Sequence, residues 1–342
     1  MRWLLPAVIV MTVGGGGASF YFAGDRISDQ IHSFFASSSG GDLAGVPQPR
    51  TKETATPETP NLAEMPALVA TGAAAPETWP DLAPSDLLAQ SAALGERSLK
   101  DTAFDQPPWR RFARPFAAPT GRPLLGLLIT GLGTDRGVTA AAIAGLPADV
   151  SLSFNPYAVD LADWIAAARA FGHEAMVDLP LQSKTKRDLG PRGLLVGLSE
   201  GEVHRRIEAI TASALGTFGL AGDGGDALLL DDTATAGILR EIARLGLSFI
   251  DTSDEPMSQT MPVAQEVTLP ATRSAVTLDE RPSRAAITER LAVAANLAQE
   301  RGRALAVAKA SPLVITTLAD WLRRQGDQGP VSAPASAMLQ RE

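Results

Sequence analysis

Apolar positions along the chain follow two different patterns, and the boundary between them lies near residue 122. After it, short continuous apolar runs alternate with longer segments whose apolar residues recur every three or four positions. Continuous runs are typical of strands buried on both faces, and the wider spacing is typical of amphipathic helices. A single folded domain is therefore predicted over residues 123–325.

The alternation of these segments predicts the fold class. Strands are predicted at 124–129, 150–154, 175–179, 217–221, 247–251, 263–267 and 304–308. Helices are predicted at 138–144, 161–171, from Ser199 onward, 233–245, 283–299 and 313–323, with Ser199 and Asp231-Asp232 as N-caps. Such repeats predict an α/β fold with a parallel sheet covered by helices, either a (β/α) barrel-like domain or an open doubly wound sheet. Both forms place a site at the carboxyl ends of the strands.

The first 24 residues are predicted to form a membrane anchor. Residues 3–24 carry no charge and are long enough to span the ~30 Å apolar core of a bilayer as one helix. Arg2 precedes this run, so we expect a single-pass inner-membrane protein whose C-terminal domain lies in the periplasm. The alternative is a cleaved signal peptide, with Gly16-Gly17-Ala18 as the cleavage region, and it places the domain outside the cytoplasm as well.

Residues 25–122 are rich in Pro, Ala and Thr and are predicted to be a mostly disordered linker. Within it, a short helix at 82–99 and docking of Trp109, Phe112 and Phe116 onto the domain are the alternative to a plain tether. Residues 326–342 are predicted to be a disordered tail.

Composition narrows the chemistry. The net charge is −8, and no basic stripe appears, so a nucleic-acid partner is not expected. The chain has no cysteine and three histidines, His32, His173 and His204; the last two are predicted in a turn and on a helix surface, away from any site. Neither a dinucleotide-binding glycine motif nor a phosphate-binding loop follows any predicted strand, so no nucleotide cofactor is expected.

Four stretches carry a family resemblance, and they occur in the order LLITGLGTD, SLSFNPYA with GHEAMVDLPLQ, GLSFIDTSDEP and ALAVAKASP. Their order and spacing over residues 124–323 resemble the divergent polysaccharide deacetylases. The resemblance implies a β/α barrel in which aspartate and histidine at strand ends bind a divalent metal. It also implies hydrolysis of an acetamide by metal-bound water.

The metal-binding motifs of that family are degenerate in this chain. Thr130-Gly131 stands at the family's Asp-Asp pair, and Asp178 and Lys309 stand at two of its histidine positions. Asp223 falls near a third histidine position, whereas Asp251 matches a retained strand-end acid. A zinc site of the usual kind needs nitrogen or sulfur ligands, so no metal ligands are assigned.

Aspartates remain at the predicted strand ends. Asp178, Asp223 and Asp251 are the candidate catalytic residues, with Asp226 and Lys309 as candidate binding residues. If the four carboxylates converge, they are suited to a hard divalent cation or to sugar hydroxyls. The DGGD sequence at 223–226 is typical of a turn and needs no ligand to explain it. Lys309 is expected either to pair with an aspartate, replacing the charge of the lost metal, or to face solvent.

Three functions remain open. The first is a catalytically degenerate domain without a cofactor that binds a cell-envelope polysaccharide or an envelope protein. The second is an active metal-dependent carbohydrate deacetylase or hydrolase that uses Asp178, Asp223, Asp226 and Asp251 with a divalent cation. The third is a scaffold in which the barrel is only a folded head. Enzymatic activity is thus undecided by the sequence.

Overall fold

The computed structural model describes residues 79, 81–91, 105–185, 188–325 and 329–340, together with two short strands near the N-terminus. The chain divides into two units, residues 1–58 and 59–342. In the first unit, β1 (Val13–Gly14) pairs with β2 (Gly17–Ala18) in antiparallel fashion. These four residues belong to the predicted membrane anchor, and the rest of that segment lies outside the described residues. No helix in the described part of the chain is long and apolar enough to cross a bilayer.

The second unit is built on a nine-stranded sheet in which every pairing is parallel. The order across the sheet is β8-β7-β6-β5-β4-β3-β10-β9, and β11 pairs with β3. The strands are β3 (Leu124–Leu132), β4 (Ser151–Phe154), β5 (Ala175–Leu181), β6 (Gly219–Gly224), β7 (Ser248–Asp251), β8 (Ala271–Arg273), β9 (Val276–Thr277), β10 (Arg303–Lys309) and β11 (Val331–Ala333).

The chain itself joins the two edges of this sheet. Although β8 and β9 lie at opposite ends of the strand order, only Ser274 and Ala275 separate them in sequence. The Ser274 N–H donates to the Asp251 carbonyl on β7 at 2.8 Å, and the Ala275 N–H donates to the Leu305 carbonyl on β10 at 2.7 Å. The sheet therefore curls until its edges meet, as the predicted barrel-like fold requires.

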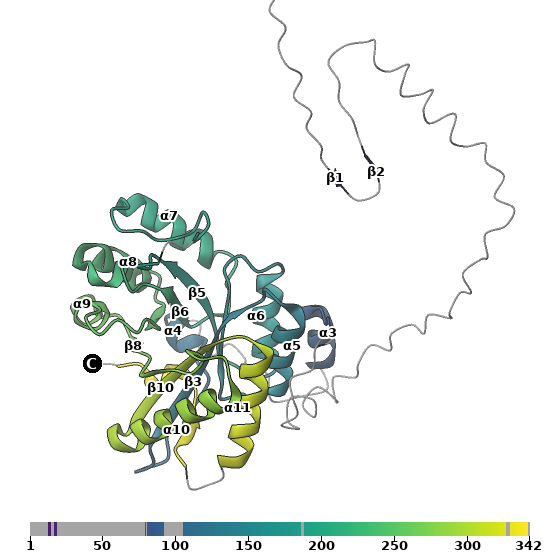
Figure 1. Cartoon of the computed structure of the whole chain (residues 1–342). Coiled ribbons are helices and arrows are strands. Elements are labelled where there is room, and N and C mark those ends of the chain that lie inside the picture. The colour runs from purple at the N-terminus through teal and green to yellow at the C-terminus, as the bar shows by residue number, and fades with distance from the viewer. Residues whose placement is uncertain are drawn as a thin grey trace, which may run out of the picture. The chain divides into compact units, whose positions relative to one another are not determined.

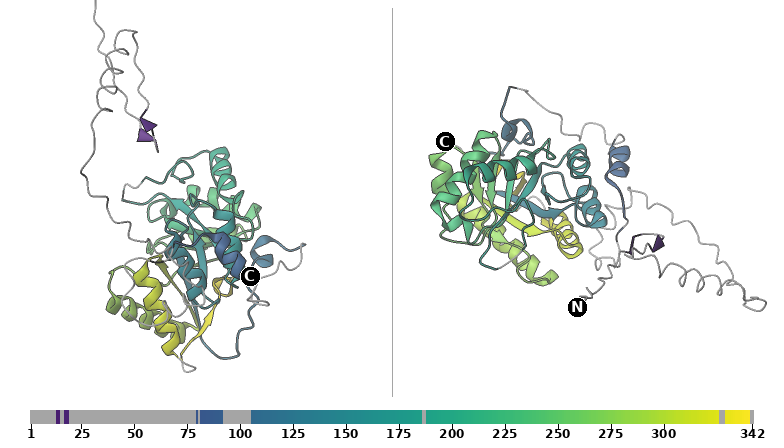
Figure 2. Two further views of the ribbon diagram at one scale, coloured as in Figure 1. Left: turned by 90° about the vertical axis from the view of Figure 1, so that its right-hand side faces the viewer. Right: turned by 90° about the horizontal axis from the view of Figure 1, so that it is seen from above.

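Helices cover the outside of the strands (Figures 1 and 2). They are α5 (Arg136–Gly145), α6 (Leu161–Ala170), α7 (Glu200–Thr211), α8 (Asp232–Arg244), α9 (Thr260–Glu266), α10 (Arg284–Arg301) and α11 (Pro312–Gln325). Two predicted N-caps are confirmed: Ser199 accepts from the Glu202 N–H at 3.3 Å, and Asp231 accepts from the Ala234 N–H at 2.8 Å. The prediction of a strand at 263–267 is wrong, because these residues lie mostly in α9. A short apolar run has no periodicity that separates a strand from a buried helix turn.

Part of the predicted linker is folded onto the barrel. Helix α3 (Pro84–Ser91) packs against α6, and Leu82 and Leu87 are buried there (Figure 1). Helix α4 (Pro108–Arg111) buries Trp109. The prediction of a mostly disordered linker over 25–122 is therefore wrong at 81–91 and 105–122, where the alternative of a short helix and of docking by Trp109, Phe112 and Phe116 is observed. A few apolar side chains anchor these segments to the barrel. The average composition, which is dominated by Pro and Ala, does not reveal such isolated anchoring residues.

The predicted disordered tail is also wrong for residues 329–340. The tail holds strand β11 and the 3₁₀ helix η4 (Ala335–Met338). Met338 and Leu339 are buried with Met176 and Phe218 in the interior of the barrel. Gly126 makes room for them, since a Cβ at this position would lie 2.8 Å from the Met338 Cγ. The segment is short and its side chains are mostly small, so it shows no hydrophobic periodicity that would predict a helix or strand. It nevertheless closes the amino end of the barrel.

A buried carboxyl group fastens these additions to the barrel. One oxygen of Glu174 accepts the Arg114 N–H at 2.7 Å, and the other accepts the Ser151 hydroxyl and the Ser336 N–H, each at 3.1 Å. Burial raises the pKa of the Glu174 carboxyl, and these donors oppose the shift. Glu174 thus joins the segment before β3, strand β4 and the C-terminal segment at one point.

Packing at the amino end yields a stability prediction. Met338→Ala should lower the free energy of unfolding by about 3 kcal/mol, because it removes a fully buried side chain and leaves a cavity. Urea unfolding followed by circular dichroism measures the loss. Leu215→Ala, at a position that is 80% exposed, is the matched control and should change stability by less than about 0.5 kcal/mol. Equal, small effects of both substitutions would mean that the tail is not part of the core.

Candidate functional site

The candidate site lies at the carboxyl ends of the strands, on the inner face of the barrel. Met176 and Ala221 belong to the interior cluster, and Asp178 and Asp223 each lie two residues farther along the same strand. Val307 is interior too, and Lys309 follows it by two residues on β10. Because side chains on one face recur every second residue, these three polar side chains point into the mouth of the barrel.

An ion pair spans this mouth. The Lys309 Nζ lies 3.1 Å from Asp223 Oδ1, although β10 and β6 are not adjacent in the sheet. The Lys309 side chain is 61% exposed and that of Asp223 is 23% exposed. The Lys309 N–H also donates to Asp279 Oδ2 at 3.1 Å. Of the two alternatives for Lys309, pairing with an aspartate is observed, while the side chain also remains exposed to solvent.

Asp178 lies below this pair and is buried. The Ser153 hydroxyl donates to its Oδ1 at 2.5 Å, and the Gly131 N–H donates to its Oδ2 at 2.8 Å. Gly131 has a φ of +76°, which glycine adopts without strain, and it falls where the pairing of β3 with β4 is irregular. Burial raises the pKa of Asp178 to about 6, with a smaller upward effect from Asp223 and opposing effects from Ser153, Gly131 and Lys309.

Asp251 does not belong to the site, and its predicted convergence with the other aspartates is wrong. Ile250 lies in the barrel interior, so Asp251 points to the outer face of β7. There it is fully buried and accepts hydrogen bonds from the Ser253 and Ser258 hydroxyls at 2.6 and 2.7 Å. Its carboxylate also lies 3.0 Å from the Arg273 Nε. These contacts hold the loop between β7 and α9, which is a structural role.

A pocket of about 310 Å³ opens beside the ion pair. Asp223 and Asp226 line it, and the Lys184 N–H donates to Asp226 Oδ1 at 3.2 Å. Gly224 and Gly225 both have positive φ, so the DGGD segment is at once a turn and a wall of the pocket. Further lining residues are Thr130, Thr252, Ser253, Asp254, Thr277, Asp279 and Lys309.

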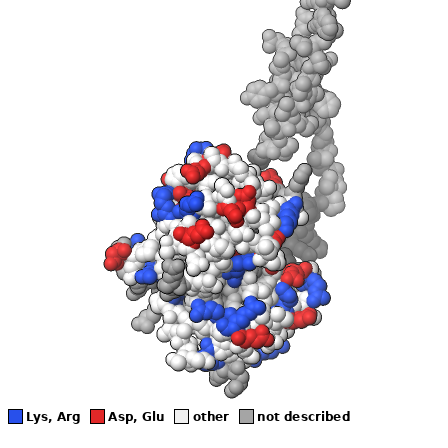
Figure 3. All heavy atoms as spheres, turned by 90° about the vertical axis from the view of Figure 1, so that its left-hand side faces the viewer, with Lys and Arg blue, Asp and Glu red and all other residues white. Residues whose placement is uncertain are grey.

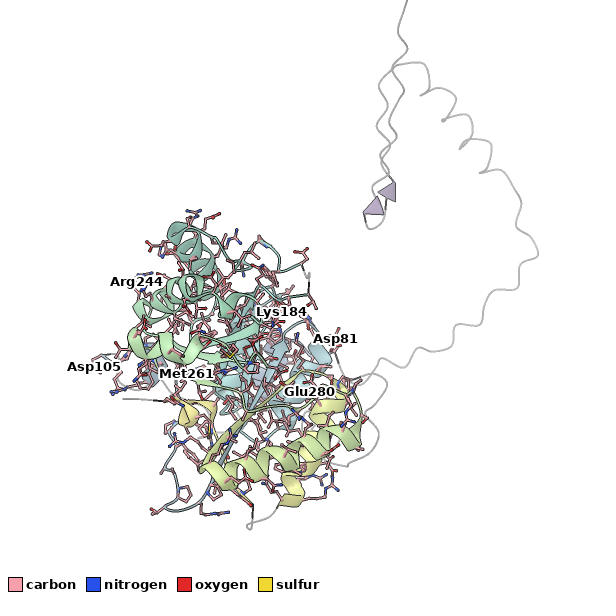
Figure 4. All side chains as sticks on the ribbon, turned by 60° about the vertical axis from the view of Figure 1, so that its left-hand side comes forward. Asp81, Asp105, Lys184, Arg244, Met261 and Glu280 are labelled. Atoms are coloured by element: carbon pink, nitrogen blue, oxygen red, sulfur yellow. The ribbon has the colours of Figure 1, made fainter. Side chains whose placement is uncertain are left out.

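The side chains labelled in Figure 4 show the direction in which the carboxyl end of the barrel faces. Lys184 and Glu280, which lie on loops after β5 and β9, project on the opposite side of the domain from Arg244 and Asp105 (Figure 4). Arg244 ends α8, and Asp105 precedes α4, so both mark the amino end of the barrel. The pocket therefore opens away from the end that the N-terminal and C-terminal segments close.

The residues at the mouth do not fit the divalent metal that the family resemblance implies. An ammonium group stands at one expected ligand position, and Thr130-Gly131 replaces the carboxylate pair. Across the described residues, no group of three or more His, Cys, Asp or Glu could hold a metal ion. Asp223 and Asp226 are brought together with Lys309, whereas Asp178 lies deeper and Asp251 lies outside.

Several polar residues of the site were not identified from the sequence. Ser153 holds Asp178, and Asp254 and Asp279 line the pocket. The alternation in SLSF, with Leu152 outside, is the signal that places Ser153 inside the barrel. Asp279 follows a two-residue strand that has no visible pattern.

Neither histidine of the folded unit lies at the mouth. His173 lies at the turn that enters β5, as predicted, and is buried, with its ring nitrogens 2.8 and 2.9 Å from the Val150 and Ile143 carbonyl oxygens. Burial lowers the pKa of His173. His204 lies on α7 with its Nδ1 2.9 Å from Glu241 Oε1, as a half-exposed helix residue.

Comparison with known proteins agrees with this architecture. Residues 127–339 match the family model for divergent polysaccharide deacetylase. The uncharacterized protein YibQ of Escherichia coli (strain K12) is 23% identical over 176 residues, which cover 52% of this chain and 55% of YibQ. An uncharacterized protein of Haemophilus influenzae is 22% identical over 183 residues, or 54% of this chain and 65% of its own length. The matches thus span about half to two thirds of these curated relatives.

A solved structure shares the fold. The crystal structure of the uncharacterized protein ATU2773 from Agrobacterium tumefaciens C58 superposes with a TM-score of 0.65 at 26% identity. The superposition covers 69% of this chain and 97% of that protein.

The raised pKa of Asp178 predicts a pH dependence. Between pH of about 4 and 6 the folded state holds this proton more tightly than the unfolded chain, so the free energy of unfolding falls as pH rises. Asp178→Asn keeps an acceptor for the Gly131 N–H and removes the titration. Relative to the native chain, the variant should therefore gain about 2 kcal/mol between pH 4 and 7.5.

Urea unfolding at the two pH values measures this difference. Asp163→Asn, at an exposed position of α6, is the matched control and should follow the native chain at both pH values. A constant difference between Asp178→Asn and the native chain across the window would show that Asp178 is ionised normally.

Proposed function

Since the chain belongs to the divergent polysaccharide deacetylase family, we propose that it is a non-hydrolytic member that binds a ligand of the cell envelope at the mouth of its barrel. The ion pair between Lys309 and Asp223 carries this proposal. The positive charge of Lys309 lies against a carboxylate at the strand ends, where the family resemblance leads one to expect a metal ion. A fixed ammonium group repels a divalent cation and offers it no lone pair.

The remaining acids support binding better than hydrolysis. The Asp178 oxygens accept from Ser153 and Gly131, so they are occupied by protein donors. Asp251 lies on the outer face against Arg273. An active metal-dependent deacetylase or hydrolase that uses Asp178, Asp223, Asp226 and Asp251 is the less favoured alternative, because only two of the four line the pocket.

The proposed place of action is the cell envelope. The uncharged run at residues 3–24 would anchor the chain in the inner membrane, with the barrel in the periplasm. A cell-envelope polysaccharide and an envelope protein are the two candidate ligands. Acidic and basic side chains are intermixed on the face shown in Figure 3, a surface suited to an aqueous compartment rather than to nucleic acid.

The first test of the function concerns metal and turnover. Zinc, cobalt and nickel should bind the purified chain no more tightly than they bind Asp223→Ala, and an acetylated chitooligosaccharide should not lose acetate. The reason is that an ammonium group, a threonine and a glycine stand at expected ligand positions. Isothermal titration calorimetry and acetate release are the measurements.

A restoration variant is the control for this test. Asp178→His should not create activity, because Thr130-Gly131 and Lys309 still supply no metal ligands and leave the coordination shell of the metal incomplete. Stoichiometric zinc with turnover that Asp223→Ala abolishes would overturn the non-hydrolytic proposal and favour the hydrolase.

Localisation is tested separately. A phosphatase reporter that is active only after export, fused after Glu342, should be active in cells, because the uncharged run preceded by Arg2 should send the remainder outward. A fusion to a chain that lacks residues 1–24 is the control and should be inactive. Activity of the shortened fusion, or inactivity of the full one, would contradict the periplasmic assignment.

A further inference from the structure

Exposed apolar side chains are concentrated on one half of the mouth. Of the eight large apolar residues that are exposed in the described part of the chain, six lie on loops that follow β4, β5, β6 and β7, which are neighbours in the sheet. We call these six the apolar crescent: Tyr157, Val159, Leu195, Val196, Leu230 and Met257. Exposed apolar groups gathered on one surface mark an interaction site more often than scattered ones do.

Hydrogen bonds fix the loops of the crescent to one another. The Gln182 side-chain oxygen accepts a hydrogen bond from the Val196 N–H at 2.8 Å. The Gln182 backbone carbonyl accepts one from the Leu228 N–H at 3.1 Å. The Gln259 N–H donates to the Leu229 carbonyl at 2.7 Å, which joins the loop of Met257 to that of Leu230. The crescent is therefore held on a preformed surface, which lowers the entropic cost of binding.

The crescent borders the polar pocket, because two loops contribute to both. Leu230 shares its loop with Asp226, and Met257 shares its loop with Asp254. Four aspartates and one lysine line the pocket, so its ionisable groups carry a net formal charge of −3. Besides the Lys309–Asp223 pair, Asp254 and Asp279 accept from the Thr277 hydroxyl and the Lys309 N–H, which are neutral donors. Asp226 accepts the Lys184 N–H and is attracted to the Lys184 ammonium group, whose charge is already matched by its ion pair with Glu255.

We propose that this end of the barrel docks a protein partner that places a Lys or Arg side chain in the pocket and aliphatic side chains on the apolar crescent. This inference rests on the proposed binding function and names its ligand. The excess of carboxylates selects a cationic group, and the long aliphatic stem of Lys or Arg suits a pocket with an apolar border. Arginine is also enriched among the residues that dominate interface energies.

The same surface is poorly suited to a polysaccharide. Sugar rings pack on open aromatic faces, and Tyr157 is the single aromatic residue of the crescent. Its hydroxyl donates to the Leu189 carbonyl at 2.8 Å, and the Arg192 guanidinium lies 5.5 Å from its ring centroid. One face of the ring is thus already covered, and the other five side chains are aliphatic or a thioether.

Selection from a display library of short random peptides on the purified full chain is the experiment. Enriched peptides should carry a Lys or Arg flanked by aliphatic residues, and their affinity should fall with added salt. Leu230→Ser with Met257→Ser, and separately Asp254→Asn with Asp279→Asn, should each weaken the enriched peptide by about tenfold or more. Leu215→Ser and Glu266→Gln, exposed positions away from the mouth, are the matched controls and should leave its Kd unchanged.

Other outcomes overturn this inference. Enriched peptides without a basic residue, or a Kd that neither pair of substitutions changes in variants with native circular dichroism, would reject the assigned surface. Binding of a chitooligosaccharide that Leu230→Ser abolishes, without any peptide binding, would assign the mouth to a glycan. Self-association that the same substitution abolishes would assign it to a second copy of the chain. Zinc-dependent acetate release would instead reject the proposed function, and its readout is separate from peptide binding.

Discussion

The carboxyl group of Glu174 is the point at which three distant parts of the chain meet. It accepts from Arg114 ahead of the first barrel strand, from Ser151 on β4 and from Ser336 near the C-terminus. Burying a carboxyl group away from water is costly unless its oxygens are hydrogen-bonded. The three segments and the carboxyl group therefore stabilise one another. The arrangement closes the amino end of the barrel, and the carboxyl end is left as the place where a ligand can enter.

At that open end, the period of two along each strand decides which polar residues can act together. Asp178, Asp223 and Lys309 each follow an interior residue by two positions, whereas Asp251 follows the interior Ile250 by one. The same carboxylate chemistry therefore has a different consequence on the two faces. On the inner face Asp223 meets Lys309 across the mouth, and on the outer face Asp251 fixes a loop through Arg273 and two serines.

Sequence patterns predicted the elements that are long or strongly periodic, including β3, the α6, α8, α10 and α11 helices and the N-caps at Ser199 and Asp231. They failed where tertiary contacts override composition. The segment around Met338 is short and rich in small residues, so nothing local distinguishes it from a disordered tail. The helix around Leu87 was anticipated only as the alternative to a plain tether. At the site, the pairing of Lys309 with an aspartate could be anticipated from its place at a strand end. The outward orientation of the Asp251 side chain could not, because the sequence does not show which side of β7 faces the barrel interior.

A polar mouth is therefore no evidence of catalysis in this fold. Once Asp178 is buried, its oxygens need the Ser153 hydroxyl and the Gly131 N–H whether or not a reaction occurs. Removing any of these three polar groups leaves a buried polar group without its partner. Lys309 likewise offsets the charge of Asp223. Such mutual dependence can preserve a polar layer whether or not the mouth binds a metal ion. What distinguishes this mouth is the apolar crescent, which the polar layer does not require and which binding to a partner explains.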